Sequence, residues 1–128
     1  MWVFLNNAFV SAVQHRANAK VLVVRARLPG DLERLFPDLA DHVERTPRAD
    51  YLFRVNVPKA RFAKMLKAQV DAINYDNFKG SVGDRFRHDT YMGVWSVMYR
   101  AQNQSLEGEL MGAPDFEVSS WPGMSDDE

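Results

Sequence analysis

The 128-residue chain is 46% hydrophobic and 26% charged, the composition of a soluble globular protein. A chain of this length buries enough surface to fold around one core without a metal ion or a disulfide. It contains no cysteine, which excludes disulfides, cysteine-ligated metal sites and thiol catalysis. The N-terminal segment lacks the positive start of a signal peptide, and no apolar run approaches the ~20 residues of a membrane span. We therefore expect a cytoplasmic protein without membrane partners.

The net charge of −1 hides an uneven distribution. Residues 1–103 hold all 16 basic residues and 10 of the 17 acids, a net charge of +6, whereas residues 104–128 hold seven acids and no Lys or Arg, a net charge of −7. Eleven of the basic residues are arginine, which suits bidentate binding of carboxylate and phosphate. The arginines indicate either a solvated surface or an anion-binding surface that the acidic end shields or mimics.

Three stretches in the first half of the chain are typical of β-strands. Residues 2–14 are rich in β-formers, with Asn6-Asn7 as a two-residue turn or a bulge. Residues 21–27 form the clearest strand, and residues 51–57 alternate between apolar and polar positions. The alternation predicts one face made of Tyr51, Phe53, Val55 and Val57. A short helix is expected after Pro29-Gly30, with Asp31 at its positive end.

Two longer helices are expected in the second half. Residues 59–73 follow Pro58 and place Phe62, Met65, Leu66, Val70 and Ile73 on one apolar face. After a loop over residues 74–83, a last helix runs from Asp84 to about Gln102. Its apolar stripe contains Trp95, which we expect to anchor the core, and Gly93 indicates close packing in the middle of the helix.

This order of elements predicts an α+β fold, a two-layer sandwich of a three- or four-stranded antiparallel sheet with helices on one face. A variant of the ferredoxin-like arrangement is one option. Residues 1–103 are expected to form a single domain. Residues 104–128 would be an acidic tail, flexible or bound to a partner through Leu110, Phe116 and Trp121.

No catalytic constellation is evident. His88 is a candidate general base, but on a helix the neighbouring Asp89 projects about 100° away from it. The three histidines, His15, His42 and His88, lie on separate predicted elements without metal-ligand spacing. We therefore expect neither catalytic residues nor a metal or cofactor, and the sequence favours a protein without enzymatic activity.

One candidate anion site follows the loop over residues 74–83. The segment KGSVGDRFR lacks both phosphate-loop motifs but combines backbone N–H groups at a helix start with basic side chains. Lys79, Arg85, Arg87 and His88 are the candidate ligands. An ordinary loop leading into a capped helix explains the same residues.

A second candidate site is the sheet. If helices cover only one side, the other side carries Arg25, Arg27 and Arg54 beside Phe4 or Phe9. Basic residues interleaved with aromatic residues on an open sheet bind nucleic acid in some small folds, by charge neutralisation and stacking. The alternative is that these arginines only keep an exposed face soluble, and burial in ion pairs would remove the argument for binding.

Four blocks of the sequence resemble a family of small bacterial and bacteriophage proteins that has no established activity. The blocks are VLVVRARLPGDLERLFP, ADYLFRVNVPKA, INYDNFKGSV and HDTYMGVWSVMYRAQ, and the resemblance covers about residues 1–103. It assigns no functional residue, but it implies an accessory protein of a phage or prophage.

Three functions remain open. The first is a non-enzymatic accessory factor that binds a host protein or nucleoprotein, for example to inhibit a host defence, with nucleic acid as a further partner. The second is a nucleotide- or phosphate-ligand-binding protein or enzyme that uses Lys79, Arg85, Arg87 and His88. The third is a self-associating structural module, a homo-oligomer.

Overall fold

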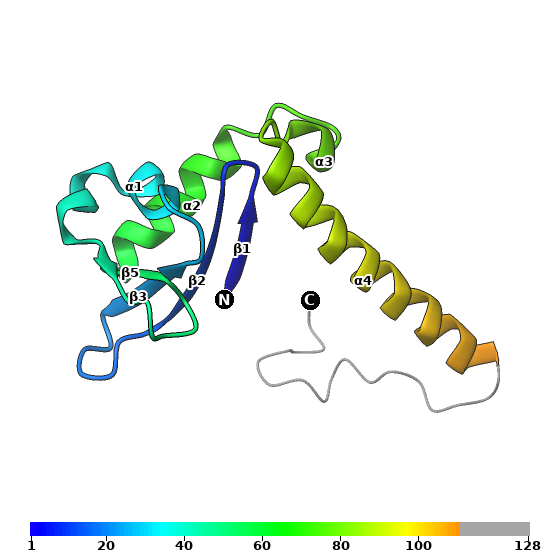
Figure 1. Ribbon diagram of the computed structural model, residues 1–128, viewed down its shortest axis with the longest axis horizontal. Helices are drawn as coiled ribbons and strands as arrows, with labels where there is room; N and C mark the ends of the chain where they lie inside the picture. The colour runs from blue at the N-terminus through cyan, green and yellow to red at the C-terminus, as the bar shows by residue number, and fades with distance from the viewer. Residues whose placement is uncertain (111–128) are drawn as a thin grey trace. The chain divides into compact units, whose positions relative to one another are not determined.

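The computed structural model describes residues 1–110, which divide into two compact units, residues 1–87 and the chain from His88 onward. Figure 1 labels the main elements. Their bounds, in chain order, are β1 (Trp2–Leu5), β2 (Ala8–Gln14), β3 (Val21–Ala26), α1 (Asp31–Leu35), η1 (Pro37–His42), β4 (Glu44–Arg45), β5 (Phe53–Pro58), α2 (Lys59–Asp71), α3 (Phe78–Ser81) and α4 (Arg85–Leu110).

The first unit contains a five-stranded antiparallel sheet in the order β1-β2-β3-β5-β4, which confirms the predicted α+β sandwich. The strand that the sequence did not predict is β4, which has only two residues, Glu44 and Arg45. Three strands precede the first helix, whereas a ferredoxin-like fold has a helix directly after its first strand. The topology is therefore not a ferredoxin-like one.

The predicted break at Asn6-Asn7 is a turn and not a bulge. Leu5 of β1 pairs directly with Ala8 of β2, so the two asparagines alone connect the strands. Among the described residues, no amino acid other than glycine has a positive φ. The turn therefore forms without the left-handed conformation that asparagine tolerates.

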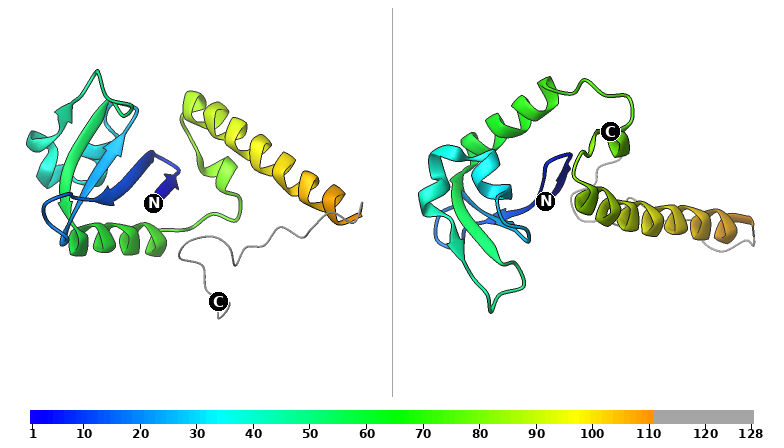
Figure 2. Two further views of the ribbon diagram at one scale, coloured as in Figure 1. Left: turned by 90° about the horizontal axis from the view of Figure 1, so that it is seen from below. Right: turned by 45° about the horizontal axis from the view of Figure 1, so that its top comes forward.

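The core lies on one face of the sheet. Ala12, Val24 and Val55 stand opposite one another on the three central strands and are buried, because directly paired residues project to the same side. The helices α1 and α2 cover this face (Figure 2) and pack on it through buried apolar side chains: Leu32, Leu35, Phe36, Phe62 and Met65.

Three side chains predicted for apolar core faces are exposed. Val70 and Ile73 are 63% and 52% exposed, because only the first turns of α2 reach the core through Phe62 and Met65. Trp95 is 46% exposed, so the prediction that it anchors the core is wrong. The core is built from the sheet, α1 and α2, whereas Trp95 belongs to the second unit.

The second unit consists, as far as it is described, of α4. The helix has 26 residues, a length of about 39 Å at 1.5 Å per residue, and it continues past residue 103, where the sequence predicts the tail to begin. Apart from its chain neighbours and the backbone of α4 itself, no described atom lies within 4 Å of a Cβ placed on Gly93, so the close packing predicted there is not found among the described residues. Among the described helices, none is both long and apolar enough to span a membrane.

Candidate functional site

The uncovered face of the sheet carries a row of paired side chains that crosses all five strands. Trp2 pairs with Ser11, Ser11 with Arg25, Arg25 with Arg54, and Arg54 with Glu44. Directly opposed residues share a face of the sheet, and this face is opposite to that of the buried core residues because neighbouring positions alternate. The strand register therefore brings Arg25 and Arg54 side by side, as the sequence predicted. We call this surface the arginine face.

Two guanidinium groups of the arginine face, those of Arg25 and Arg27, contact the ring of Tyr51. The Cζ atoms of Arg25 and Arg27 lie 4.5 Å and 4.1 Å from the centre of its ring. Tyr51 is 4% exposed but is absent from the apolar core cluster, so the prediction that it shares a core face with Phe53 is wrong. It precedes β5, and its loop folds back beneath the cations. Cation–π contact of this kind orders a guanidinium group without neutralising it.

The remaining contacts of these arginines are with uncharged groups. Arg25 donates from Nη2 to the Ser11 hydroxyl at 2.8 Å, and Arg27 donates from Nη1 to the Asp50 carbonyl oxygen at 2.7 Å. Within residues 1–110, no ion pair includes Arg25, Arg27 or Arg54. The burial in ion pairs that would have removed the argument for binding is therefore not found.

Two arginines adjoin each other at the centre of this face, and Glu44, the acidic side chain of the row, lies opposite Arg54. Arg25 and Arg54 are directly paired on adjacent strands and only partly exposed, an arrangement in which like charges destabilise a sheet. The Nε atoms of both side chains are buried and have no hydrogen-bond partner. Partly desolvated charge without a counter-charge is costly. Glu44 is the cross-strand neighbour of Arg54, whereas those of Arg25 are Ser11 and Arg54, so the cost falls mainly on Arg25 and a bound anion would offset it.

Aromatic side chains lie on the same face beside the arginines. Phe4 pairs with Phe9 one row away from Trp2 and Ser11. The rings of Phe4 and Phe9 are 4.4 Å apart, and the ring of Trp2 stands edge-on to that of Phe9 at 6.3 Å. Trp2 is 68% exposed, which leaves an indole surface on which another ring can stack.

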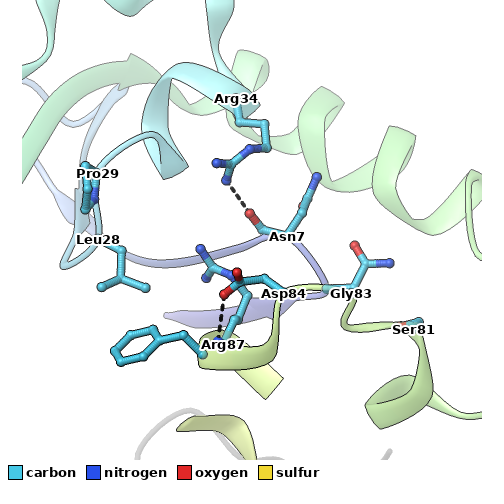
Figure 3. A pocket seen from close by; sticks show the side chains of 10 residues that line it. Asn7, Leu28, Pro29, Arg34, Ser81, Gly83, Asp84 and Arg87 are labelled. Atoms are coloured by element: carbon cyan, nitrogen blue, oxygen red, sulfur yellow. Dashed lines mark hydrogen bonds between the residues drawn. The ribbon is translucent and has the colours of Figure 1, made fainter. Parts of the chain in front are cut away.

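The second predicted anion site is organised differently. Arg87 is buried and forms an ion pair with Asp31, with Nη2 2.5 Å from Oδ1 and Nη1 3.2 Å from Oδ2. Asp31 is fully buried and also accepts hydrogen bonds from the backbone N–H of Phe9 and from Arg34. Arg87 thus has a structural counter-charge. The backbone N–H of Arg87 donates a hydrogen bond of 2.8 Å to the Asp84 carboxylate, and Asp84 thereby caps the start of α4 (Figure 3).

A cavity of about 640 Å³ lies beside this ion pair. Arg34 and Arg87 line it (Figure 3), together with Asn7 and Asp84, and Arg34 donates to the Asn7 carbonyl oxygen. Lys79, Arg85 and His88 are not among the lining residues. Of the four predicted ligands, only Arg87 therefore contributes to the cavity, and its guanidinium group is engaged by a carboxylate.

The other candidate residues for chemistry lie apart or are exposed. His88 Nδ1 and Asp89 Oδ1 are 3.3 Å apart in an exposed position. The two side chains are therefore in contact, although the helix was expected to direct them about 100° apart. Among the described residues, no three histidine or acidic side chains form a metal-binding group. Arg61 bonds to Asp38 at 3.1 Å and lowers the pKa of that carboxyl group.

A second cavity, of about 540 Å³, lies between β1 and the end of α2. It is lined by apolar side chains of both elements, among them Val3, Leu5, Val70 and Ile73. The exposed end of the apolar face of α2 is thus part of a groove. Tyr75 is the titratable side chain among its lining residues.

The sequence analysis missed two residues of the arginine face. Trp2 has the same parity along β1 as Phe4, so the strand pattern contained the signal for it. The strand pattern contained no such signal for Tyr51, because its contact with the guanidinium groups of Arg25 and Arg27 depends on the conformation of the loop before β5. Of the predicted tail residues, Leu110 ends α4, and Phe116 and Trp121 lie outside the described residues.

The chain was compared with protein-family models, curated proteins and solved structures, and it matches none of them. The resemblance to the bacterial and bacteriophage family therefore stays a prediction.

Proposed function

We propose that this chain is a non-enzymatic binding protein whose arginine face binds single-stranded nucleic acid, free or as part of a nucleoprotein. The observation that carries the proposal is the set of three guanidinium groups, of Arg25, Arg27 and Arg54, on one sheet face without an ion pair. Guanidinium groups bind phosphate oxygens in bidentate fashion, and three on one face suit a polyanion.

The aromatic neighbours favour a single strand over a duplex. Bases stack on exposed aromatic rings only where they are unpaired, and such stacking is sequence-tolerant. Trp2 is exposed at one end of the row that contains Arg25 and Arg54. A strand whose bases stack on Trp2 would have its phosphates within reach of these arginines.

The biological setting of the proposal comes from the resemblance alone. A small phage or prophage accessory protein would meet host nucleoproteins in the cytoplasm and could act by occupying their nucleic acid. Such an activity requires a binding surface and no catalytic group.

Filter binding of the full chain to single-stranded DNA and RNA at several salt concentrations tests the proposal. We expect affinity to fall steeply as salt rises, because each neutralised phosphate releases counterions. Arg27→Gln and Arg54→Gln should each lower the affinity several-fold and reduce the slope of log affinity against log salt by about one. Trp2→Ala should weaken binding by about 1–3 kcal/mol with little effect on that slope.

Arg61→Gln is the matched control. It removes the same charge, but from α2, which packs on the opposite face of the sheet. Equal losses of affinity for Arg61→Gln and Arg54→Gln, or no binding to any single strand at low salt, would contradict the proposal. Tighter binding to duplex than to single strands would retain an anion site but exclude stacking on Trp2.

A further inference from the structure

The cavity of about 640 Å³ beside the ion pair of Asp31 and Arg87 has the size of a small-ligand site. Its lining residues come from three segments that are far apart in the sequence: the turn at Asn6-Asn7, residues 28–34 and residues 81–87. All three segments belong to the first compact unit, so the cavity is formed within one body.

Arg34 presents a positive charge to this cavity. Its Nη1 donates to the Asn7 carbonyl oxygen and to Asp31 Oδ1, whereas no hydrogen bond within residues 1–110 uses its Nε or Nη2. The side chain is 45% exposed, so these N–H groups can donate to a ligand. Asp31 is fully buried and also pairs with Arg87. One carboxylate thus orients two guanidinium groups, and a net positive charge remains.

Asp84 presents a negative charge to the same cavity. It is exposed, and its Oδ2 accepts the backbone N–H of Arg87 at 2.8 Å. Within residues 1–110 its Oδ1 has no hydrogen bond and is available to a ligand. Figure 3 shows Arg34 and Asp84 on different walls of the cavity. Because Asp84 would repel a phosphate, the two charges together favour a ligand that carries both a cation and an anion.

The rest of the lining includes an apolar surface. Leu28, Pro29 and Phe86 line the cavity, and Phe86 is 67% exposed. Ligand sites combine apolar surface, which supplies affinity, with a few polar groups that fix the orientation of the ligand. The lining therefore suits a zwitterion that also has an apolar group.

We infer that this cavity binds a free α-amino acid with an apolar side chain. Its carboxylate accepts hydrogen bonds from Arg34, and its ammonium group donates to the carboxylate of Asp84. Its side chain lies against the apolar surface of Leu28, Pro29 and Phe86. Because Asp31 holds the Arg34 guanidinium in place before a ligand binds, little ordering is needed on binding. This inference does not depend on nucleic-acid binding by the arginine face.

NMR titration of the full chain with L-phenylalanine tests the inference, because shifts of backbone amides locate the bound ligand. We expect the largest shifts at Asn7, Ser81 and Gly83. L-phenylalanine amide lacks the carboxylate and N-acetyl-L-phenylalanine lacks the ammonium group. Measured below the pKa of the amine, each should bind at least about fivefold more weakly than L-phenylalanine. Glycine, which lacks the apolar side chain, should bind about tenfold more weakly.

Two variants connect each charge of the ligand with one residue. Asp84→Asn should remove the preference for L-phenylalanine over its N-acetyl form and keep the preference over the amide. It should retain the fold, because asparagine caps a helix as well as aspartate does. Arg34→Gln should have the reverse effect on the two preferences. Asp38→Asn and Arg61→Gln remove the same charges from an ion pair outside the cavity and should change neither preference.

The inference is wrong if L-phenylalanine shifts no amide of the cavity up to its solubility limit. It is also wrong if Asp84→Asn and Asp38→Asn change the preference for the free ammonium group equally. Adenosine monophosphate that binds more tightly than L-phenylalanine at the same amides would assign the cavity to phosphate ligands and exclude the amino acid. If Arg34→Gln does not fold, equal binding of L-phenylalanine and its amide to the unaltered chain would still contradict the carboxylate contact.

Discussion

Two arginines of this chain show how the position of a counter-charge decides the role of a residue. Arg87 and Asp31 are 56 positions apart, and both are buried in one ion pair. Arg54 is also partly buried, and among the described residues its cross-strand neighbour Glu44 forms no ion pair with it. Arg87 therefore stabilises the fold, whereas Arg54 has charge that remains for a ligand.

Asp31→Asn should destabilise the chain by about 3–5 kcal/mol, because it leaves the Arg87 guanidinium buried without a counter-charge. Chemical denaturation measures the loss. Asp38→Asn is the matched control, since it removes the same charge from an exposed pair with Arg61 and should leave stability essentially unchanged. Equal effects of the two substitutions would show that the buried pair is not a structural anchor.

At the scale of elements, two glycines differ in whether another residue could take their place. Gly30 precedes α1 with φ of 89°, and a Cβ placed on it would lie 3.1 Å from Nη2 of Arg34. Gly93 lies inside α4 with open space around its Cα. Gly30 is therefore required by backbone conformation, whereas Gly93 only lowers the stability of its helix.

Gly93→Ala should stabilise α4 by about 1 kcal/mol, and Gly30→Ala should destabilise the chain by about 1–2 kcal/mol. Thermal unfolding followed by circular dichroism would separate the two effects. Destabilisation by Gly93→Ala would show that another surface packs closely on that part of α4.

The elements that could be predicted from the sequence are those in which the spacing of apolar residues matches the positions that are buried. Val55 and Val57 alternate with polar residues, and Phe62 and Met65 recur at helical spacing, so their burial follows from local pattern. The same spacing misplaced Trp95, because an apolar stripe in a sequence looks alike whether or not the core reaches it. The arginine face was predictable from parity along the strands. The contact of Arg25 with Tyr51 was not, because it depends on how a loop folds back.

At the scale of the whole molecule, charge is divided between the parts of the chain. Residues 111–128 contain five acids and no basic residue, so without them the net charge changes from −1 to +4. Net charge acts at a distance on the approach of a polyanion, and salt screens this effect.

Removal of residues 111–128 should therefore tighten binding to single-stranded nucleic acid several-fold at low salt, and the gain should vanish near 1 M salt. Filter binding with the full and shortened chains measures the difference. A full-length chain in which the five acids are replaced by their amides should behave like the shortened one. If only the shortened chain gains affinity, Phe116 or Trp121 contributes, and not charge.

The two described tryptophans belong to different elements, Trp2 to β1 within the arginine face and Trp95 to α4. Each is partly open to water, so each indole has an emission that responds to whatever covers it. With Trp121 replaced by phenylalanine, Trp2→Phe and Trp95→Phe variants would each retain a single fluorophore. Quenching of Trp2 emission by an oligonucleotide, with the emission of Trp95 unchanged, would then report contact at the arginine face without any added dye.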